Sequence, residues 1–183
     1  MIEVIVELQH FKIKLYKIPS YFCSMESLNE IITRFVDATG DFLKSKNVTV
    51  EYDFDPHMPQ VYRFGTPDYL LKMLSELTGE QSDAAIFDTS LTKLRYSTLS
   101  LKGVQIVVIE HNGKPLPSET IAQLNRQLDQ IYINWETVNP GGRGGNRRAA
   151  IQISPFGGRI SIENHPDREY KVETTVEIPT YTV

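Results

Sequence analysis

Two carboxylates and a histidine are the side chains of this sequence that are best spaced for binding chemistry. A helix predicted to begin at Thr66-Pro67 carries Glu76 and Glu80, which are four residues apart and share one face if the helix continues past Gly79. Carboxylate oxygens are ligands for hard divalent cations. The same two residues are equally consistent with solvated charges at a helix end, so both interpretations stay open at this point.

The histidine follows a strand predicted over residues 104–109. His111 and Gly113 precede Pro115, a residue that fixes φ and has no N–H to donate. A neutral imidazole can accept one hydrogen bond, whereas a protonated imidazole cannot accept any. His-Asn-Gly and Lys-Pro are also good turn formers. A plain strand-to-helix turn is therefore as good an interpretation of this segment as a ligand contact.

A third segment is rich in glycine and arginine. Gly141, Gly144 and Gly145 surround Arg143, and Asn146 follows them. A glycine-rich loop ahead of a helix can bind phosphate, and arginine can contact phosphate with two hydrogen bonds. The same composition is typical of a flexible loop that contacts an acidic partner or nothing. The basic residues of this stretch are Arg143, Arg147 and Arg148.

The elements that must position these segments are predicted from residue periodicity. Ser27 and Glu30 form an S-x-x-E capping box ahead of apolar residues with helical spacing, which predicts a helix over residues 27–46. Helices and strands mix without strict β-α-β alternation, so the predicted class is α+β, a two-layer sandwich. Further helices are predicted to start at 66–67 and 117–118, a short helix or turn at 149–153, and strands at 48–54, 60–64, within 84–99, 104–109, 160–162 and 172–178.

Composition limits the class of protein. The chain has 183 residues, enough for one domain, with 40% hydrophobic and 23% charged residues, as in ordinary soluble proteins. A net charge of −4 disfavours a nucleic-acid binder. Cys23 is the only cysteine, no apolar run approaches the roughly 18 residues of a membrane span, and no signal peptide is apparent. We therefore expect a cytoplasmic protein without membrane or nucleic-acid partners.

The chain is predicted to consist of an N-terminal segment, residues 1–20, and a single domain, residues 21–183. Ile2, Val4, Val6 and Leu8 alternate as in a strand. Some of the same residues, with Ile5, also fit the stripe of a helix, and this alternative stays open. Pro19 ends the segment in either case.

In this order and at this spacing, the segments resemble the catalytic, ATP-binding domain of bacterial sensor histidine kinases, a branch of the GHKL or Bergerat-fold ATPases. Residues 65–70 match the start of the helix that those kinases write as G-D-P-D-x-L. Residues 156–162 and 174–179 are similar to their closing hairpin, G-G-x-I-x-I followed by T-x-x-x-x-L-P. The resemblance implies a two-layer α/β sandwich with a mixed, mostly antiparallel sheet, and ATP and Mg²⁺ as cofactors.

The resemblance also assigns roles to the candidate site residues. The asparagine that ligates Mg²⁺ falls on Glu80, with Glu76 at an earlier asparagine position. The aspartate that accepts a hydrogen bond from adenine falls on His111, and Gly113 matches the first glycine of that motif. The phosphate loop falls on residues 141–146, with Arg143 where a middle glycine is usual. If the domain is active, Glu80 would hold Mg²⁺, His111 would meet adenine and Arg143 would stabilise the γ-phosphate.

All three nucleotide motifs thus depart from the family pattern at the residues that carry the chemistry. This predicts a degenerate, pseudokinase-like domain that binds ATP weakly or not at all and acts as a docking or regulatory module in two-component signalling. Its partners would be a response regulator or sensor-kinase domains.

The phosphoacceptor histidine box is missing and no residue is assigned a catalytic role. The N-terminal segment would be the remnant of a dimerisation helix, through which two copies would associate. A third hypothesis, anion or nucleic-acid binding by the arginines of residues 143–148, is disfavoured by the net acidity.

Overall fold

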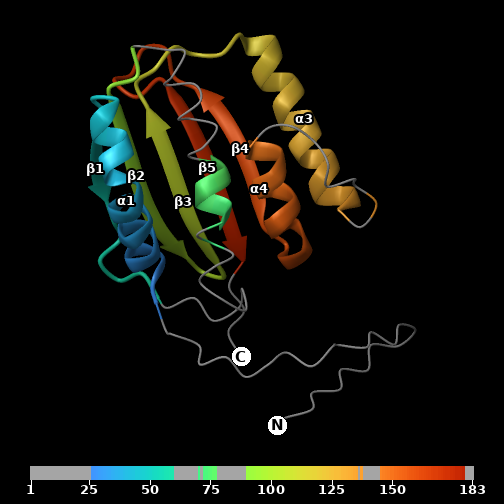
Figure 1. Cartoon of the computed structure of the whole chain (residues 1–183). Coiled ribbons are helices and arrows are strands. Elements are labelled where there is room, and N and C mark those ends of the chain that lie inside the picture. The colour runs from blue at the N-terminus through green and yellow to red at the C-terminus, as the bar shows by residue number, and fades with distance from the viewer. Residues whose placement is uncertain are drawn as a thin grey trace.

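A single five-stranded sheet organises the part of the chain that the computed structural model describes, namely residues 26–59, 70, 72–77, 90–135, 137 and 145–179. The labelled helices lie on one face of this sheet (Figure 1). The arrangement is a two-layer α/β sandwich, as the sequence predicted. The helices are α1 (Leu28–Ser45), α3 (Ser118–Asn134) and α4 (Gly145–Ile153), with a further helical segment at residues 72–77.

The sheet is mixed and mostly antiparallel. Its strand order is β1-β2-β3-β5-β4, in which β1 pairs with β2 in parallel and every other pairing is antiparallel. This confirms the predicted α+β class. The strands predicted at 60–64 and at 84–89 lie outside the described residues. The strands are β1 (Thr49–Asp53), β2 (Lys93–Leu101), β3 (Val104–His111), β4 (Arg159–Asn164) and β5 (Val172–Pro179).

The capping box at the start of α1 is confirmed. Ser27 Oγ accepts the backbone N–H of Glu30, and the Glu30 carboxylate accepts the N–H of Ser27 at 2.6 Å. These hydrogen bonds lower the pKa of Glu30. The helix ends at Ser45, one residue short of the predicted range, and Asn47 follows with a positive φ of 58°. Phe42 is 43% exposed, whereas the neighbouring Leu43 lies on the buried stripe of the helix.

The core lies between the sheet and the helices. Alternate residues of each strand point into it, and the intervening residues point to the opposite face. On β3 the intervening Val104, Ile106 and Val108 are only partly buried. The most deeply buried side chains include Leu94, Tyr96, Val107, Ile109, Val176 and Ile178 of the sheet, and Met73, Leu74 and Leu77 of the helical segment 72–77.

Two adjacent glycines connect α4 to β4 through a short 3₁₀ helix, Ser154–Phe156. Gly157 has a left-handed φ of 78°, and its N–H donates to Ser154 O. Gly158 donates to Ile153 O at 3.0 Å. A Cβ on Gly158 would lie 2.8 Å from Cβ of Ile153. Gly157 is therefore required for its left-handed backbone conformation, and Gly158 for the close approach of Ile153. These two requirements explain the glycines of the hairpin motif.

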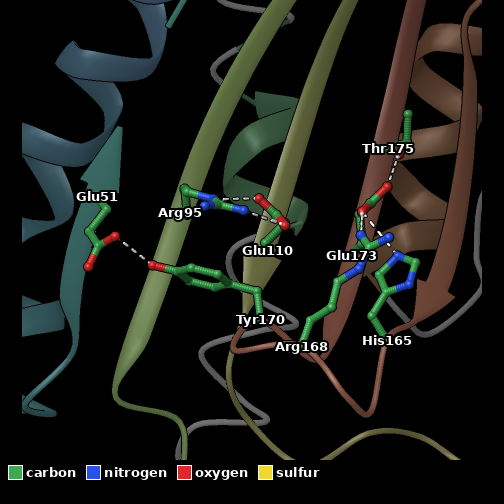
Figure 2. Close-up of polar contacts among 8 residues, drawn as sticks. All are labelled: Glu51, Arg95, Glu110, His165, Arg168, Tyr170, Glu173 and Thr175. Atoms are coloured by element: carbon green, nitrogen blue, oxygen red, sulfur yellow. Dashed lines mark hydrogen bonds and ion pairs between the residues drawn. The ribbon is translucent and has the colours of Figure 1, made fainter. Parts of the chain in front are cut away.

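A row of charged residues crosses the sheet on the face opposite to the helices. Register places one residue from each strand side by side in this order: Glu51, Arg95, Glu110, Glu173 and Glu163. Arg95 binds Glu110 with two hydrogen bonds, Nε to Oε2 at 2.6 Å and Nη2 to Oε1 at 2.8 Å (Figure 2). The Glu110 side chain is only 8% exposed, and this guanidinium is its counter-ion.

The loop between β4 and β5 folds over this charged row. Tyr170 lies 4.2 Å from the Arg95 guanidinium carbon, measured to the ring centroid, and its hydroxyl donates to Glu51 at 2.7 Å (Figure 2). At the other end of the row, Nε2 of His165 lies 3.1 Å from the carboxylate of Glu173. The loop thus supplies one aromatic ring and one imidazole to a row that is otherwise rich in carboxylates.

Tyr170 predicts a pH dependence of stability above pH 10. Burial, together with the hydrogen bond to Glu51, raises the pKa of Tyr170 from 10.0 to about 12. Between pH 10 and about 12 the phenol of the unfolded chain ionises while that of the folded chain stays neutral. We therefore expect this contribution to be complete below pH 10 and to be lost as the pH rises through that window. Urea unfolding between pH 9 and 11.5 should show the decline, and Tyr170→Phe should make it smaller, leaving the part that comes from Tyr52 and Lys93, whose pKa values are also raised. An equal decline in this variant would contradict the assignment.

Candidate functional site

Five of the nine predicted site residues lie in the described part of the chain: Glu76, His111, Gly113, Gly145 and Asn146. The other four, Glu80, Gly141, Arg143 and Gly144, lie outside it. The predicted role of Glu80 as a metal ligand and the predicted loop over the phosphates therefore stay predictions. Over the described ranges, no group of three or more His, Cys, Asp or Glu side chains is placed to hold a metal ion.

Glu76 forms an ion pair with a residue that the sequence analysis placed in a different motif. Its Oε2 accepts from Nε of Arg148 at 2.5 Å. The Glu76 side chain is 20% exposed and the Arg148 side chain 49%. Arg148 is the fourth residue of α4, so the pair joins the helical segment 72–77 directly to the helix that follows the glycine-rich stretch.

This ion pair changes what both side chains can do. The guanidinium of Arg148 was a candidate for contact with phosphate, and in the structure it binds a carboxylate, which has similar planar oxygen acceptors. Glu76 was a candidate for contact with Mg²⁺, and its charge is opposed by a cation at hydrogen-bonding distance. A polyphosphate or a metal would have to displace one of these partners before it could bind the other.

His111 is the last residue of β3 and is buried, with 8% exposure. Its Nδ1 accepts the backbone N–H of Gly113 at 3.2 Å. A backbone N–H is always a donor, so Nδ1 is the acceptor and the proton of the neutral ring is on Nε2. An aspartate at this position would offer acceptors alone. His111 therefore differs from the family's residue in the direction of its hydrogen bonding as well as in its charge.

The turn that holds His111 and Gly113 is fixed by Asn112. Its Oδ1 accepts the backbone N–H groups of Thr92 and Lys93, each at 2.9 Å, and its Nδ2 donates to the hydroxyl of Thr92 at 2.9 Å. The sequence analysis noted His-Asn-Gly only as a turn former and missed this clamp. An asparagine directly after a strand was the available signal, because its amide can satisfy neighbouring backbone groups.

Gly145 and Asn146 open α4. Gly145 is the first residue of the helix and is buried, as are Ala149 and Ala150 one turn further on. The helix is longer than predicted, since the sequence analysis placed only residues 149–153 in a short helix or turn. Asn146 and Arg148 therefore belong to the first turn of a helix, the place where backbone N–H groups lack partners within the helix.

The strand order and the single layer of helices define the class: this is the histidine-kinase-type ATPase fold. Three solved structures share it with the chain. The catalytic domain of the histidine kinase ThkA, in a nucleotide-free form, superposes with a TM-score of 0.62 at 19% identity, over 85% of this chain and 94% of that one. ThkA in complex with the response regulator TrrA superposes with a TM-score of 0.59 at 17% identity, over 85% of this chain and 41% of that chain. The mycobacterial sensor histidine kinase MprB superposes with a TM-score of 0.57 at 13% identity, over 86% of this chain and 97% of that one.

At these identities the structural likeness establishes the fold. No family model matches the sequence. A search of curated proteins also gives no match. Within the ranges that the structure describes, the helices are too short or too polar to cross a lipid bilayer.

The described residues fit ATP and Mg²⁺ poorly. At the adenine position, the acceptor nitrogen of His111 already binds the N–H of Gly113, whereas the amino group of adenine needs an acceptor. At the position that the resemblance places near Mg²⁺, Glu76 binds Arg148. Two of the positions that the resemblance assigns to the nucleotide are thus occupied by contacts within the protein.

Proposed function

We propose that this chain is a degenerate catalytic-like domain of the histidine-kinase type, with weak or no ATP binding, which acts as a docking or regulatory module in two-component signalling. The observation that carries the proposal is the ion pair between Glu76 and Arg148. In the kinases that the sequence resembles, Mg²⁺ and the phosphates lie between the corresponding helix and the glycine loop. Here the carboxylate of Glu76, in the segment 72–77, binds the guanidinium of Arg148 directly, in the helix that follows the glycine-rich stretch.

The hydrogen bonding of His111 supports the same proposal. A pseudokinase needs the fold for its surface and does not need the polar contacts of the nucleotide. The clamp of Asn112 and the bond from Gly113 to His111 hold the former adenine turn in a defined conformation without a ligand. The turn is then a structural element, which is the alternative that the turn-forming sequence had left open.

A response regulator is the partner that we propose, with sensor-kinase domains as the related possibility. The support is that ThkA, whose catalytic domain has the same fold, has been solved in complex with the response regulator TrrA. We propose a cytoplasmic location for this chain, as expected from its sequence. A pull-down with purified response regulators, in their phosphorylated and unphosphorylated forms, tests the partnership independently of nucleotide.

Nucleotide titration tests the proposed degeneracy. We expect calorimetry with ADP or ATP, with and without Mg²⁺, to show no binding at micromolar concentrations. Micromolar affinity of the intact protein that depends on Mg²⁺ would overturn the proposal in favour of an active ATP-binding domain with atypical ligands.

The ion pair itself makes a sharper prediction. Glu76→Gln removes the charge that holds Arg148, so we expect affinity for inorganic pyrophosphate to rise at least tenfold, because a charge-assisted contact becomes available to the ligand. Adding Arg148→Gln should abolish the gain. Arg34→Gln, which breaks the exposed ion pair with Glu26, is the matched control and should leave affinity unchanged. An unchanged affinity in Glu76→Gln would show that the pair is not what obstructs anions.

A further inference from the structure

The two edges of the sheet differ in how their backbone groups are satisfied. At the β4 edge, Asn125 of α3 binds the backbone of Ile162 with both ends of its amide: Nδ2 donates to Ile162 O at 2.8 Å, and Oδ1 accepts from Ile162 N at 3.0 Å. A side chain thus takes the place of a neighbouring strand. At the other edge, no described strand lies beyond β1.

The backbone of β1 shows which of its groups face outward. The N–H of Thr49 donates to Thr92 O, and the N–H of Asp55 donates to Thr98 O. The backbone groups of the odd-numbered residues therefore point toward β2. Backbone groups alternate in direction along a strand. The N–H and C=O groups of Val50 and Tyr52 therefore point away from β2, toward the edge beyond which no described strand lies, where an added strand could bind them.

The side chains of β1 give this edge two different faces. On the helix side, Val50 and Phe54 pack against the core, and Tyr52 is 44% exposed with its ring centroid 5.0 Å from that of Phe54. On the opposite side, Glu51 and Asp53 are exposed. A strand that fits this edge needs apolar residues on one face and basic residues on the other.

A second copy of β1 does not meet this requirement. Pairing two β1 strands about a two-fold axis would place the carboxylates of Glu51 and Asp53 against one another, and like charges across a strand pair are destabilising. The edge thus selects against self-pairing and in favour of a cationic segment.

The chain itself contains such a segment. Residues 11–15 read Phe-Lys-Ile-Lys-Leu, with three apolar residues on one face of a strand and two lysines on the other. Ten residues, 16–25, separate them from Glu26, the first described residue. Ten residues can span about 33 Å, and β1 is about 17 Å long. The start of α1 lies near the end of β1, because Nδ2 of Asn29 donates to Asp55 O at 2.8 Å.

We propose that residues 11–15 of the same chain add to the β1 edge as a sixth strand. Phe11, Ile13 and Leu15 would lie over Tyr52 and Phe54, and Lys12 and Lys14 would lie beside Glu51 and Asp53. The inference selects the strand alternative for the N-terminal segment. It does not depend on nucleotide binding or on the proposed function.

Hydrogen exchange of the full-length protein, measured by NMR for single amides, tests the proposal. The amides of Val50 and Tyr52 are expected to exchange at least 100-fold more slowly than unprotected amides. Ile13→Asp puts a carboxylate on the apolar face and Lys14→Glu reverses a cation, so each is expected to speed exchange at least tenfold. Lys102→Glu, in the exposed turn after β2, is the charge-matched control and should change nothing. Combining Asp53→Lys with Lys14→Glu should restore protection.

The Ile162 amide serves as the internal reference, because Asn125 protects it in every variant if the domain stays folded. Fast exchange of Val50 and Tyr52 in the intact protein, or equal protection in Ile13→Asp, would overturn the proposal. Protection that depends on protein concentration would overturn the arrangement within one chain and would place the segment on a second copy.

Discussion

Replacing Arg95 with methionine is expected to lower the free energy of unfolding by about 3–5 kcal/mol. The substitution keeps much of the length of the side chain but removes the guanidinium, so the buried carboxylate of Glu110 loses both of its hydrogen bonds to Arg95 and its counter-ion. The contact between the cation and the ring of Tyr170 is lost as well. Urea unfolding monitored by circular dichroism gives the free energy directly.

The double variant Arg95→Met/Glu110→Leu separates the ion pair from the packing. With both charges gone there is no uncompensated carboxylate, so most of the stability should return. Arg34→Met breaks the exposed ion pair with Glu26, in which Nη2 and Oε2 are 2.8 Å apart. This substitution should lower the free energy of unfolding by about 1 kcal/mol or less. If Arg95→Met cost no more than this control, the burial of Glu110 would not have the energetic weight that its 8% exposure implies.

Gly158→Ala is the second substitution with a large expected effect, a loss of about 1–3 kcal/mol. The new methyl group would lie 2.8 Å from Cβ of Ile153 and 3.0 Å from its Cγ1. Neither atom is the free end of a flexible chain, and Ile153 is 2% exposed, so the hairpin connection or the end of α4 must move.

Gly40→Ala provides the matched control, because Gly40 lies within α1 and a Cβ there meets nothing within 4 Å. It should stabilise the protein by about 0.5–1 kcal/mol. Ile153→Ala removes Cγ1 and Cδ1, at 3.0 and 3.1 Å from the new methyl group, but keeps Cβ, so it should make Gly158→Ala partly less costly than in the parent protein, and a double-mutant cycle measures this coupling. Strictly additive effects would show that the two residues do not interact.

The parts of the fold that could be predicted are those with local signals. The capping box of Ser27 and Glu30 set the start of α1 within a residue, and the Gly157-Gly158 pair marked the closing hairpin. Alternation of apolar residues located β1, and a nearly continuous apolar run located β3. Each of these signals lies within a few residues of the element that it specifies, so a single sequence contains it.

The contacts of the candidate site were harder to predict because they join distant residues. Glu76 and Arg148 are 72 residues apart, and each was assigned to a different motif without any sign that they meet. The amide of Asn112 binds residues 92 and 93, which precede it by a whole hairpin. The charged row from Glu51 to Glu163 depends on the register of four strand pairs, and one sequence without homologues does not give register.

The amide of Asn125 limits how far this protein can assemble. Because it fills the hydrogen-bonding positions at Ile162, in the middle of β4, a strand of another molecule cannot pair along the whole of this edge without displacing the amide. A molecule in which both edges of the sheet can pair with other molecules could instead link end to end without closing, which is the geometry of a fibre. The side chain of Asn125 therefore works against growth into a polymer.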